Sequence, residues 1–509
     1  MIKIEVALNS KPSLGVAVNT EENTRAQNVS IYLPYTNPCM SAAPRLNEEQ
    51  KEVFKTLQKF LEHPAADTFV LKGYAGTGKT FLMQYLGGWL KEKDQNFSFL
   101  ASTGRAATVL RGKTGFPAKT VHSELYHFSK VDGVDETIPV DAPIDEYGQM
   151  TLQFLLRQPD EDKLVYIVDE ASMLSSELSE GTSYAIFGSG VLLRDFFDII
   201  GNNKVIFVGD PCQLPPVGQA FSPALDTTWL AQQGRTAVSV TLEKIVRHDA
   251  GNDILKLAAA IRNMGLQQVL PRYPKLPANR LNNVKLHPSQ EVLFKKYVTT
   301  YKAVGTNGTL AIARSNRMVN EINRAMRREL YGVMDKPLQV GDVLLVTQNN
   351  YAVPLTNGDF VVVCALGEER LQANLLFRSV RIKAVASDIE YELLLSLDIL
   401  YGRLGNFTKE QMKALMVDFN RRMRRKGVLP NTEKYKTEMK KDDYLNCIRA
   451  TYGYAVTCHK AQGGEWNDIC LFLEKSMYSM PRPELCKWWY TAVTRAKEEL
   501  HLVKEWWVV

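Results

Sequence analysis

A glycine-rich segment carries the clearest chemical signal in the sequence. Residues 73–80 read Gly-Tyr-Ala-Gly-Thr-Gly-Lys-Thr, after a short apolar run and before an apolar helical pattern. This spacing is typical of a phosphate-binding loop. Its glycines let backbone N–H groups approach phosphate oxygens, Lys79 neutralises charge on the β- and γ-phosphates, and Thr80 can ligate a magnesium ion. We therefore predict a site for ATP and Mg²⁺ formed by Gly73, Ala75, Gly76, Thr77, Gly78, Lys79 and Thr80.

Three further polar side chains follow predicted strands. Asp169 and Glu170 come directly after the run Leu164–Val168, and the carboxyl ends of strands are where ligands of α/β folds bind. We expect Asp169 to hold the metal and Glu170 to orient or deprotonate the attacking water. Gln213 lies in a proline-rich turn after the next apolar run, where its amide could sense the γ-phosphate. An Asp-Glu pair at a strand end is often only structural, but the phosphate-binding loop favours the catalytic interpretation.

Two arginines are candidates for contacting the γ-phosphate in the transition state. Arg247 ends the segment Leu-Glu-Lys-Ile-Val-Arg, and Arg495 lies in Tyr-Thr-Ala-Val-Thr-Arg-Ala-Lys at 490–497. A single arginine is most often a surface residue, so these assignments depend on position.

The order of the predicted elements indicates an α/β fold with more than one domain. Short apolar runs alternate with helical patterns from Leu46 onward, and a second set begins at Thr309. Buried parallel strands joined by crossover helices have this pattern. We predict an N-terminal β appendage at 1–44, a first α/β domain at 45–265 with an insertion at 124–163, a second domain from 266–335 and 444–509, and an inserted barrel-like and basic-helix subdomain at 336–443.

Composition adds weaker constraints. The net charge of +6 would suit a polyanionic partner without identifying one, and a predicted helix after Thr408 carries the basic run 421–426. Such a run is usually solvated, with phosphate contact as the alternative. The seven cysteines show no C-x-x-C pair, and no segment approaches the length of a membrane span. We expect a cytoplasmic protein with no membrane partner.

Eight motifs in fixed order resemble those of superfamily 1 DNA helicases, in the RecD-like and phage Dda-like branch. They are 46–50, the phosphate-binding loop, 103–107, 120–123, 169–173, the Gln213 segment, 456–463 and the Arg495 segment. The resemblance runs from Leu46 to Val503 and implies two RecA-like P-loop domains with ATP in the cleft between them. It also implies that Gln50 reads adenine, that Glu465 lies near the ribose, and that both arginines close on the γ-phosphate. The residues that it places toward single-stranded DNA are Thr103, Gly104, His122, Asn316, Thr457, His459 and Lys460.

Two features depart from the pattern of the compact phage-type proteins. Residues 1–44 have no counterpart there, and Trp466 adds a bulky aromatic beside Glu465. Residues 1–44 leave an accessory role open, and Trp466 weakens the implication that Glu465 lies near the ribose.

The resemblance implies an ATP-dependent helicase that moves along single-stranded DNA with 5′ to 3′ polarity and acts at junctions with duplex DNA. Replication or repair proteins are candidate partners. Two alternatives stay open: an RNA helicase of the same superfamily, and a nucleotide-switched, non-unwinding subunit of a DNA-processing complex.

The insertion at 124–163 is longer than a simple crossover needs. In similar phage-type helicases this segment forms a β-hairpin pin at the duplex junction, with Phe154 the expected aromatic here and Tyr147 the second choice. The alternative is that Phe154 packs the insertion against the first domain, because single aromatics are more often core than contact.

Overall fold

The computed structural model describes residues 46–134, 137–148, 150–158, 164–178, 184–246, 252–267, 269–332, 337–350, 352–402 and 404–509. The predicted N-terminal appendage and Arg247 lie outside these residues. Among the helices that are described, none combines the length and apolar character needed to cross a membrane.

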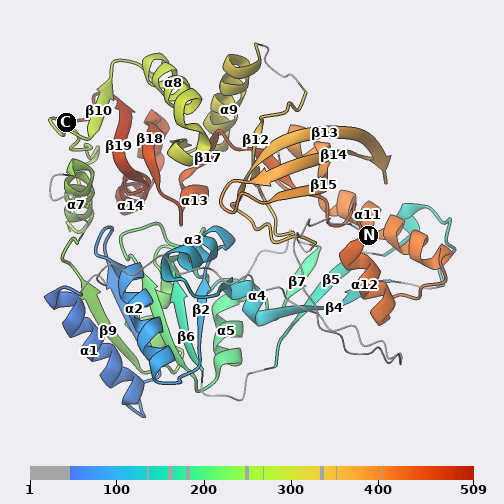
Figure 1. The fold of residues 1–509 in the computed structure, drawn as a ribbon, viewed down its shortest axis with the longest axis horizontal. Helices are drawn as coiled ribbons and strands as arrows, with labels where there is room; N and C mark the ends of the chain where they lie inside the picture. The colour runs from blue at the N-terminus through green and yellow to red at the C-terminus, as the bar shows by residue number, and fades with distance from the viewer. Residues whose placement is uncertain are drawn as a thin grey trace, which may run out of the picture. The chain divides into compact units, whose positions relative to one another are not determined.

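The first domain is a parallel sheet of six strands in the order β3-β2-β6-β8-β1-β9 (Figure 1). Its strands are β1 (Thr68–Gly73), β2 (Phe97–Ala101), β3 (Ala118–Thr120), β6 (Val165–Asp169), β8 (Lys204–Gly209) and β9 (Ala237–Leu242). Its helices are α1 (Glu48–Glu62), α2 (Lys79–Glu92), α3 (Gly104–Thr114), α4 (Val121–Leu125), α5 (Leu192–Ile200) and α6 (Thr227–Gln232). Phe69 and Leu71 join the core formed with α1 to α3, whereas Val70 joins the core formed with α4 to α6. Both faces of the sheet are therefore buried, which explains the uninterrupted apolar runs.

The second domain is a parallel sheet of five strands in the order β10-β19-β18-β11-β17. These are β10 (Val284–His287), β11 (Thr309–Ala313), β17 (Ala455–Thr457), β18 (Trp466–Phe472) and β19 (Ala496–Val503). Its helices are α7 (Asp253–Gly265), α8 (Gln290–Gly308), α9 (Asn316–Tyr331), α13 (Cys458–Ala461) and α14 (Arg482–Val493). Two RecA-like α/β units, as the sequence predicts, thus form the framework of the chain.

Helix α7 corrects the predicted boundary at residue 265. Its apolar residues Ile254, Leu257 and Ile261 share one core with Leu310 and Leu500 of the second sheet. Since these side chains are buried there and not against the first sheet, the second domain begins before α7.

The inserted subdomain is an antiparallel sheet in the order β15-β14-β13-β12-β16. It comprises β12 (Val343–Val346), β13 (Phe360–Gln372), β14 (Leu375–Ala384), β15 (Glu390–Ser396) and β16 (Ala450–Tyr452), with helices α10 (Leu397–Tyr401), α11 (Lys409–Arg425) and α12 (Glu433–Lys441). Strand β16 pairs with β12 although it lies beyond the predicted limit at 443. The subdomain therefore extends to about the start of β17.

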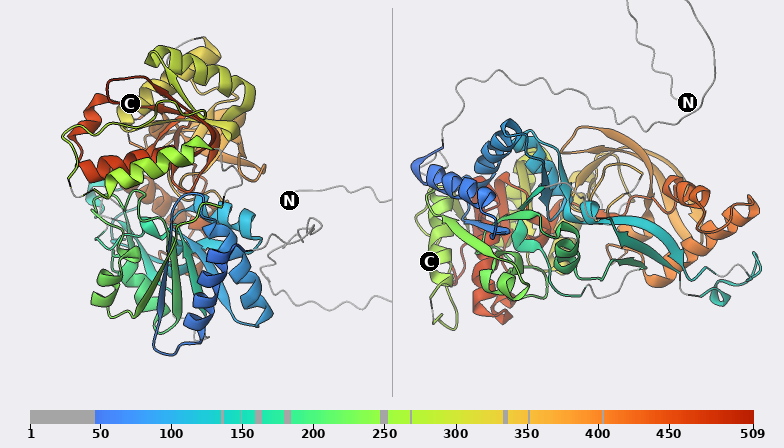
Figure 2. Two further views of the ribbon diagram at one scale, coloured as in Figure 1. Left: turned by 90° about the vertical axis from the view of Figure 1, so that its left-hand side faces the viewer. Right: turned by 90° about the horizontal axis from the view of Figure 1, so that it is seen from below.

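The insertion in the first domain forms a three-stranded sheet, β4-β5-β7 (Figure 2). Its strands are β4 (Tyr126–Asp132), β5 (Thr151–Leu156) and β7 (Ala185–Phe187). Because β7 follows Asp169 in the chain, the insertion uses more sequence than the predicted range 124–163.

The structure contradicts the assignment of Phe154 as a strand-parting aromatic. Its side chain is 6% exposed, lies in the first-domain core with α4 and α5, and stacks on Phe187 with ring centroids 4.5 Å apart. Tyr147 is 1% exposed, and its hydroxyl donates to the carbonyl of Pro139. Neither ring is free to meet a base, since both are packed inside the protein.

The arginines of α11 hold this insertion in place. Arg424 donates to the carbonyl of Ile138 at 2.6 Å, Arg425 pairs with Asp141 at 2.7 Å, and Arg421 donates to the carbonyl of Ala142. At these three positions the basic run therefore contacts the insertion.

Replacing Phe154 should destabilise the chain. Loss of a large buried aromatic costs about 3–5 kcal/mol, so Phe154→Ala should lower the free energy of unfolding by that amount, measured by urea denaturation. Leu155→Ala on the same strand is the matched control, because Leu155 is 51% exposed and should change stability by less than about 0.5 kcal/mol. Unchanged stability in Phe154→Ala would show that the ring is not core.

Candidate active site

The phosphate-binding loop joins β1 to α2 in a backbone conformation that requires glycine. Gly76 and Gly78 have φ values of 80° and 81°, and a Cβ added at Gly78 would lie 2.5 Å from Nε2 of Gln50. The Lys79 ammonium donates to the carbonyls of Gly73 at 2.6 Å and Tyr74 at 3.1 Å, so it lies folded over the loop. Thr80 follows Lys79 in the first turn of α2 and is partly exposed. These positions fit a phosphate cradle with its cation and hydroxyl at one end.

Gln50 is fixed beside this loop. It is 1% exposed, and its Nε2 donates to the carbonyl of Thr77 at 3.3 Å. Its Oε1 accepts from the backbone N–H of Asn47, and the Asn47 side chain accepts in return, which forms a capping box at the start of α1. Gln50 therefore hydrogen-bonds both the start of α1 and the phosphate-binding loop. Recognition of adenine by Gln50 stays a proposal.

Two aspartates end neighbouring strands at this edge of the sheet, and of these Asp210 is fully buried and Asp169 is partly exposed. Asp169 ends β6 and Asp210 follows β8, which pairs with β6 in parallel. Burial raises the pKa of both carboxyls, and the nearby positive charge of Lys79 opposes that rise. Glu170 adds to the rise at Asp169, although its own N–H donates to Asp169 Oδ1 at 2.9 Å. Such a carboxylate pair fits a divalent cation, with Asp169 and Thr80 as the candidate ligands.

Sequence reasoning missed Asp210 and its partner Tyr490. The Tyr490 hydroxyl donates to Asp210 Oδ2 at 2.7 Å and accepts from the backbone N–H of Ala75 at 3.0 Å. Tyr490 is 2% exposed and lies on α14 of the second domain, so burial raises the pKa of its hydroxyl. The available signal was that Asp210 follows a strand as Asp169 does, and that Tyr490 opens the Arg495 motif.

The Gln213 segment also contacts the second domain. Gln213 is 4% exposed, and its Oε1 has no hydrogen-bond partner among the described residues. The next residue, Leu214, donates its N–H to Thr491 Oγ1 at 2.9 Å and accepts from Gln462 Nε2 at 3.3 Å. A buried unpaired amide oxygen is costly, and it fits a group that contacts water or ligand during the reaction.

Arg495 is a buried cation at this boundary. It is 4% exposed and donates to the carbonyls of Thr491 at 3.0 Å and Gly464 at 3.1 Å. No ion pair joins it to a carboxylate among the described residues, although its charge opposes the rise that burial causes in the pKa of Asp210. Since a buried charge without a counter-ion is unfavourable, this guanidinium fits an anionic ligand. Its candidate partner in that role, Arg247, lies outside the described residues.

The aromatic that follows the His459 motif has a clear structural role. Trp466 is 2% exposed and donates from Nε1 to the carbonyl of Thr306 at 3.0 Å. The Arg105 guanidinium of α3 lies 4.4 Å from the Trp466 ring centroid, and burial lowers the pKa of Arg105 to about 10. Glu465 forms an ion pair with Lys113 of α3 at 3.7 Å. Both residues thus join the two domains, and the placement of Glu465 near the ribose stays a prediction.

The candidate DNA-binding residues lie at the carboxyl ends of neighbouring strands in both sheets. Ala101 of β2 pairs with Thr120 of β3, and these strands lead into Thr103 and His122. In the second sheet Ala313 of β11 pairs with Thr457 of β17. Those two strands lead into Asn316 at the start of α9 and into His459 and Lys460 on α13.

Exposure separates these residues. His122, Asn316 and Lys460 are exposed, and Thr103, Thr457 and His459 are partly exposed. Gly104 is buried, and a Cβ there would lie 1.8 Å from Thr356 Oγ1 of the inserted subdomain. Its lack of a side chain therefore permits close packing between subdomains, a role that sequence reasoning did not assign.

Two family models match the chain in this order. The AAA domain model matches residues 45–275, and the UvrD-like helicase C-terminal domain model matches 452–503. The chain is 24% identical over 311 residues to the ATP-dependent DNA helicase Pif1 of Psychrobacter sp., covering 57% of this chain and 43% of that protein. It is 24% identical over 454 residues to the ATP-dependent RecD2 DNA helicase of Deinococcus radiodurans, covering 89% of this chain and 48% of that protein. The chain thus spans less than half the length of these two curated relatives.

Among solved structures, Pif1 helicase from Bacteroides in complex with ADP-AlF3 and ssDNA is similar with a TM-score of 0.46 and 18% identity, over 90% of this chain and 92% of that one.

A phosphate-binding loop on one parallel sheet, hydrogen-bonded to Tyr490 of a domain built on a second parallel sheet, defines a P-loop protein with two RecA-like domains. The two matched models show an AAA domain and a UvrD-like helicase C-terminal domain in this chain, and the relatives named as Pif1 and RecD2 DNA helicases agree with the resemblance carried by the ordered motifs.

Tyr490→Phe should change the pH dependence of ATP turnover. The Tyr490 hydroxyl hydrogen-bonds the charged form of Asp210 and so lowers the pKa of that carboxyl, which burial raises. Removing the hydroxyl raises this pKa further, so Asp210 becomes protonated at higher pH. If the carboxylate is required, the acidic limb of the kcat profile should move to higher pH, with little change on the alkaline side. Coincident profiles for Tyr490→Phe and the wild type would exclude this role.

Proposed function

We propose that the chain is an ATP-dependent DNA helicase that moves along single-stranded DNA and separates duplex DNA at junctions. One observation carries the proposal: the Tyr490 hydroxyl of the second domain hydrogen-bonds the phosphate-binding loop of the first. A group that enters the loop must therefore alter a contact between the domains. Nucleotide can then favour one inter-domain geometry, because a ligand shifts an equilibrium by its differential affinity for the two states.

In this proposal each candidate residue has its own role in ATP hydrolysis. Lys79 and the loop amides bind the phosphates, Glu170 orients the attacking water, and Gln213 senses the γ-phosphate or that water. Arg495, with Arg247, stabilises charge that develops on the γ-phosphate. A magnesium ion held by Asp169 and Thr80 would supply further neutralisation of the phosphate oxygens.

The DNA-binding part of the proposal rests on the two strand edges. The candidate contacts that follow β2 and β3 would bind single-stranded DNA at one place, and those that follow β11 and β17 in the other sheet would bind it at a second place. A change in inter-domain geometry would alter the distance between these two DNA-binding places, which is the requirement for translocation. The relatives named as DNA helicases favour DNA over RNA. The 5′ to 3′ polarity, replication or repair partners and a cytoplasmic location stay predictions from the sequence.

A strand-displacement assay with the purified chain tests the function and its polarity. With ATP and Mg²⁺, the wild type should release a labelled strand from duplex DNA that carries a 5′ single-stranded tail, and much less from one with a 3′ tail. Glu170→Gln should bind ATP but fail to displace, because the water is no longer positioned. Lys79→Ala should in addition bind ATP weakly, since it loses phosphate neutralisation.

Each alternative predicts a different pattern. Displacement of RNA but not DNA duplexes would identify an RNA helicase, and ATP hydrolysis without displacement of either would indicate a non-unwinding subunit. Release only from 3′-tailed DNA would reverse the assigned polarity.

A further inference from the structure

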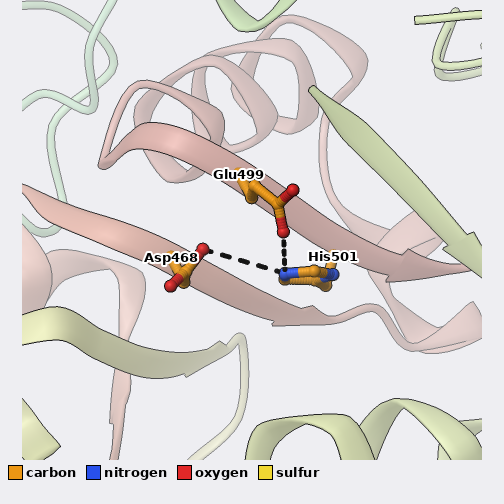
Figure 3. A group of neighbouring side chains, drawn as sticks. All are labelled: Asp468, Glu499 and His501. Carbon is orange, nitrogen blue, oxygen red and sulfur yellow. Dashed lines mark ion pairs between the residues drawn. The ribbon is translucent and has the colours of Figure 1, made fainter. Parts of the chain in front are cut away.

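One face of the second sheet carries a polar cluster whose members are not among the candidate active-site residues. Glu499 and His501 are two residues apart on β19, so their side chains project from the same face of the sheet. Asp468 of β18 pairs directly with Glu499 in the parallel register. The β structure therefore brings the three side chains together, as Figure 3 shows. A buried parallel sheet normally presents apolar residues under its helices, so this cluster needs an explanation.

The distances within the cluster suit a metal ion. His501 Nε2 lies 3.3 Å from Glu499 Oε2 and 4.0 Å from Asp468 Oδ1. One ligand atom from each residue lies within 4.8 Å of the other two. A metal with bonds of roughly 2.0–2.2 Å to nitrogen and oxygen holds its ligand atoms at separations of this size.

A second observation points to a ligand in the same place. His501 is 2% exposed, and its Nε2 has no hydrogen-bond partner among the described residues. An imidazole nitrogen without a hydrogen-bond partner can offer its lone pair to a metal.

We propose that Asp468, Glu499 and His501 form a binding site for a divalent transition metal ion. His287 acts on this site as a positioning residue, because its Nε2 lies 3.2 Å from His501 Nδ1. When Nε2 of His501 binds metal, its Nδ1 carries the proton and donates to His287. Such outer contacts fix the tautomer and orientation of a metal-binding histidine.

The ligand set distinguishes this site from the magnesium site proposed at the phosphate-binding loop. One imidazole with two carboxylates favours Zn²⁺ and its first-row neighbours, whereas Mg²⁺ prefers oxygen ligands and retains its water. The two carboxylates would balance the charge of the ion. Lys285, which lies 3.9 Å from Glu499 and is half-exposed, would have to move its ammonium group toward solvent.

The position of the site indicates a structural role. Asp468, Glu499 and His501 are not among the candidate nucleotide or DNA contacts, and they lie within the paired parts of β18 and β19. A bound ion would cross-link β18 to β19 and stabilise the second domain without entering the reaction. The inference is therefore independent of the proposed helicase activity.

Metal titration of the full chain tests the site. The protein is first treated with chelator and then titrated with Zn²⁺ by calorimetry, without nucleotide or Mg²⁺. We expect one ion per chain and a raised thermal midpoint on binding. His501→Gln should weaken affinity by more than 100-fold, and His287→Gln by about 10- to 100-fold. His127→Gln is the matched control, because His127 is an exposed histidine on β4 and should leave binding unchanged.

Co²⁺ substitution identifies the ligands directly. The visible spectrum should lack a thiolate charge-transfer band, because the proposed ligands are nitrogen and oxygen. A strong thiolate band, or wild-type affinity in folded His501→Gln, would overturn the proposal. Should His501→Gln fail to fold, Asp468→Asn serves instead, since its side chain is partly exposed, and wild-type affinity there would also overturn it.

Discussion

The hydroxyl of Tyr490 is the contact on which the geometry of the candidate active site depends. It accepts from the Ala75 N–H of the phosphate-binding loop and donates to the buried carboxylate of Asp210. A hydrogen bond to a charged group contributes about 1.5–3 kcal/mol, and each 1.4 kcal/mol changes an equilibrium about tenfold. A ligand that alters this one contact can therefore shift the balance between inter-domain geometries by an order of magnitude or more. The loop, the carboxylate and α14 are therefore joined by one pair of hydrogen bonds, through which the proposed nucleotide site would act on both domains.

Helix α14 extends this dependence to the nucleic-acid side of the molecule. Thr491, one residue after Tyr490, contacts the Gln213 segment, and the carbonyl of Trp488 accepts from Cys458 at the start of α13. Helix α13 carries His459 and Lys460, two of the candidate DNA contacts. The cation-π contact between Arg105 and Trp466 forms a second bridge between the domains. A continuous set of contacts therefore links the phosphate-binding loop to the candidate DNA contacts of both domains.

Local patterns could be predicted from the sequence, whereas groups assembled by tertiary structure could not. The phosphate-binding loop, Asp169 and the main strands follow from residues adjacent in the chain. The link from Tyr490 to Asp210 joins residues 280 positions apart, and only the folded chain brings them together. The His501 cluster depends on the register of two parallel strands. Phe154 was assigned by analogy of position, but packing against Phe187 decides its environment. Helix α7 was misplaced because an apolar helical pattern does not specify which sheet it covers.

The central claim is that the second domain completes the ATP site of the first. Single-turnover ATP hydrolysis by Arg495→Ala, with nucleotide binding measured separately, tests it most directly. The account predicts near-normal ATP binding and a loss of DNA-stimulated turnover of about 10³-fold or more, because the buried guanidinium acts on the transition state. Arg482→Ala, at an exposed position in the first turn of α14, should retain turnover. Turnover within about threefold of wild type in folded Arg495→Ala would contradict the account.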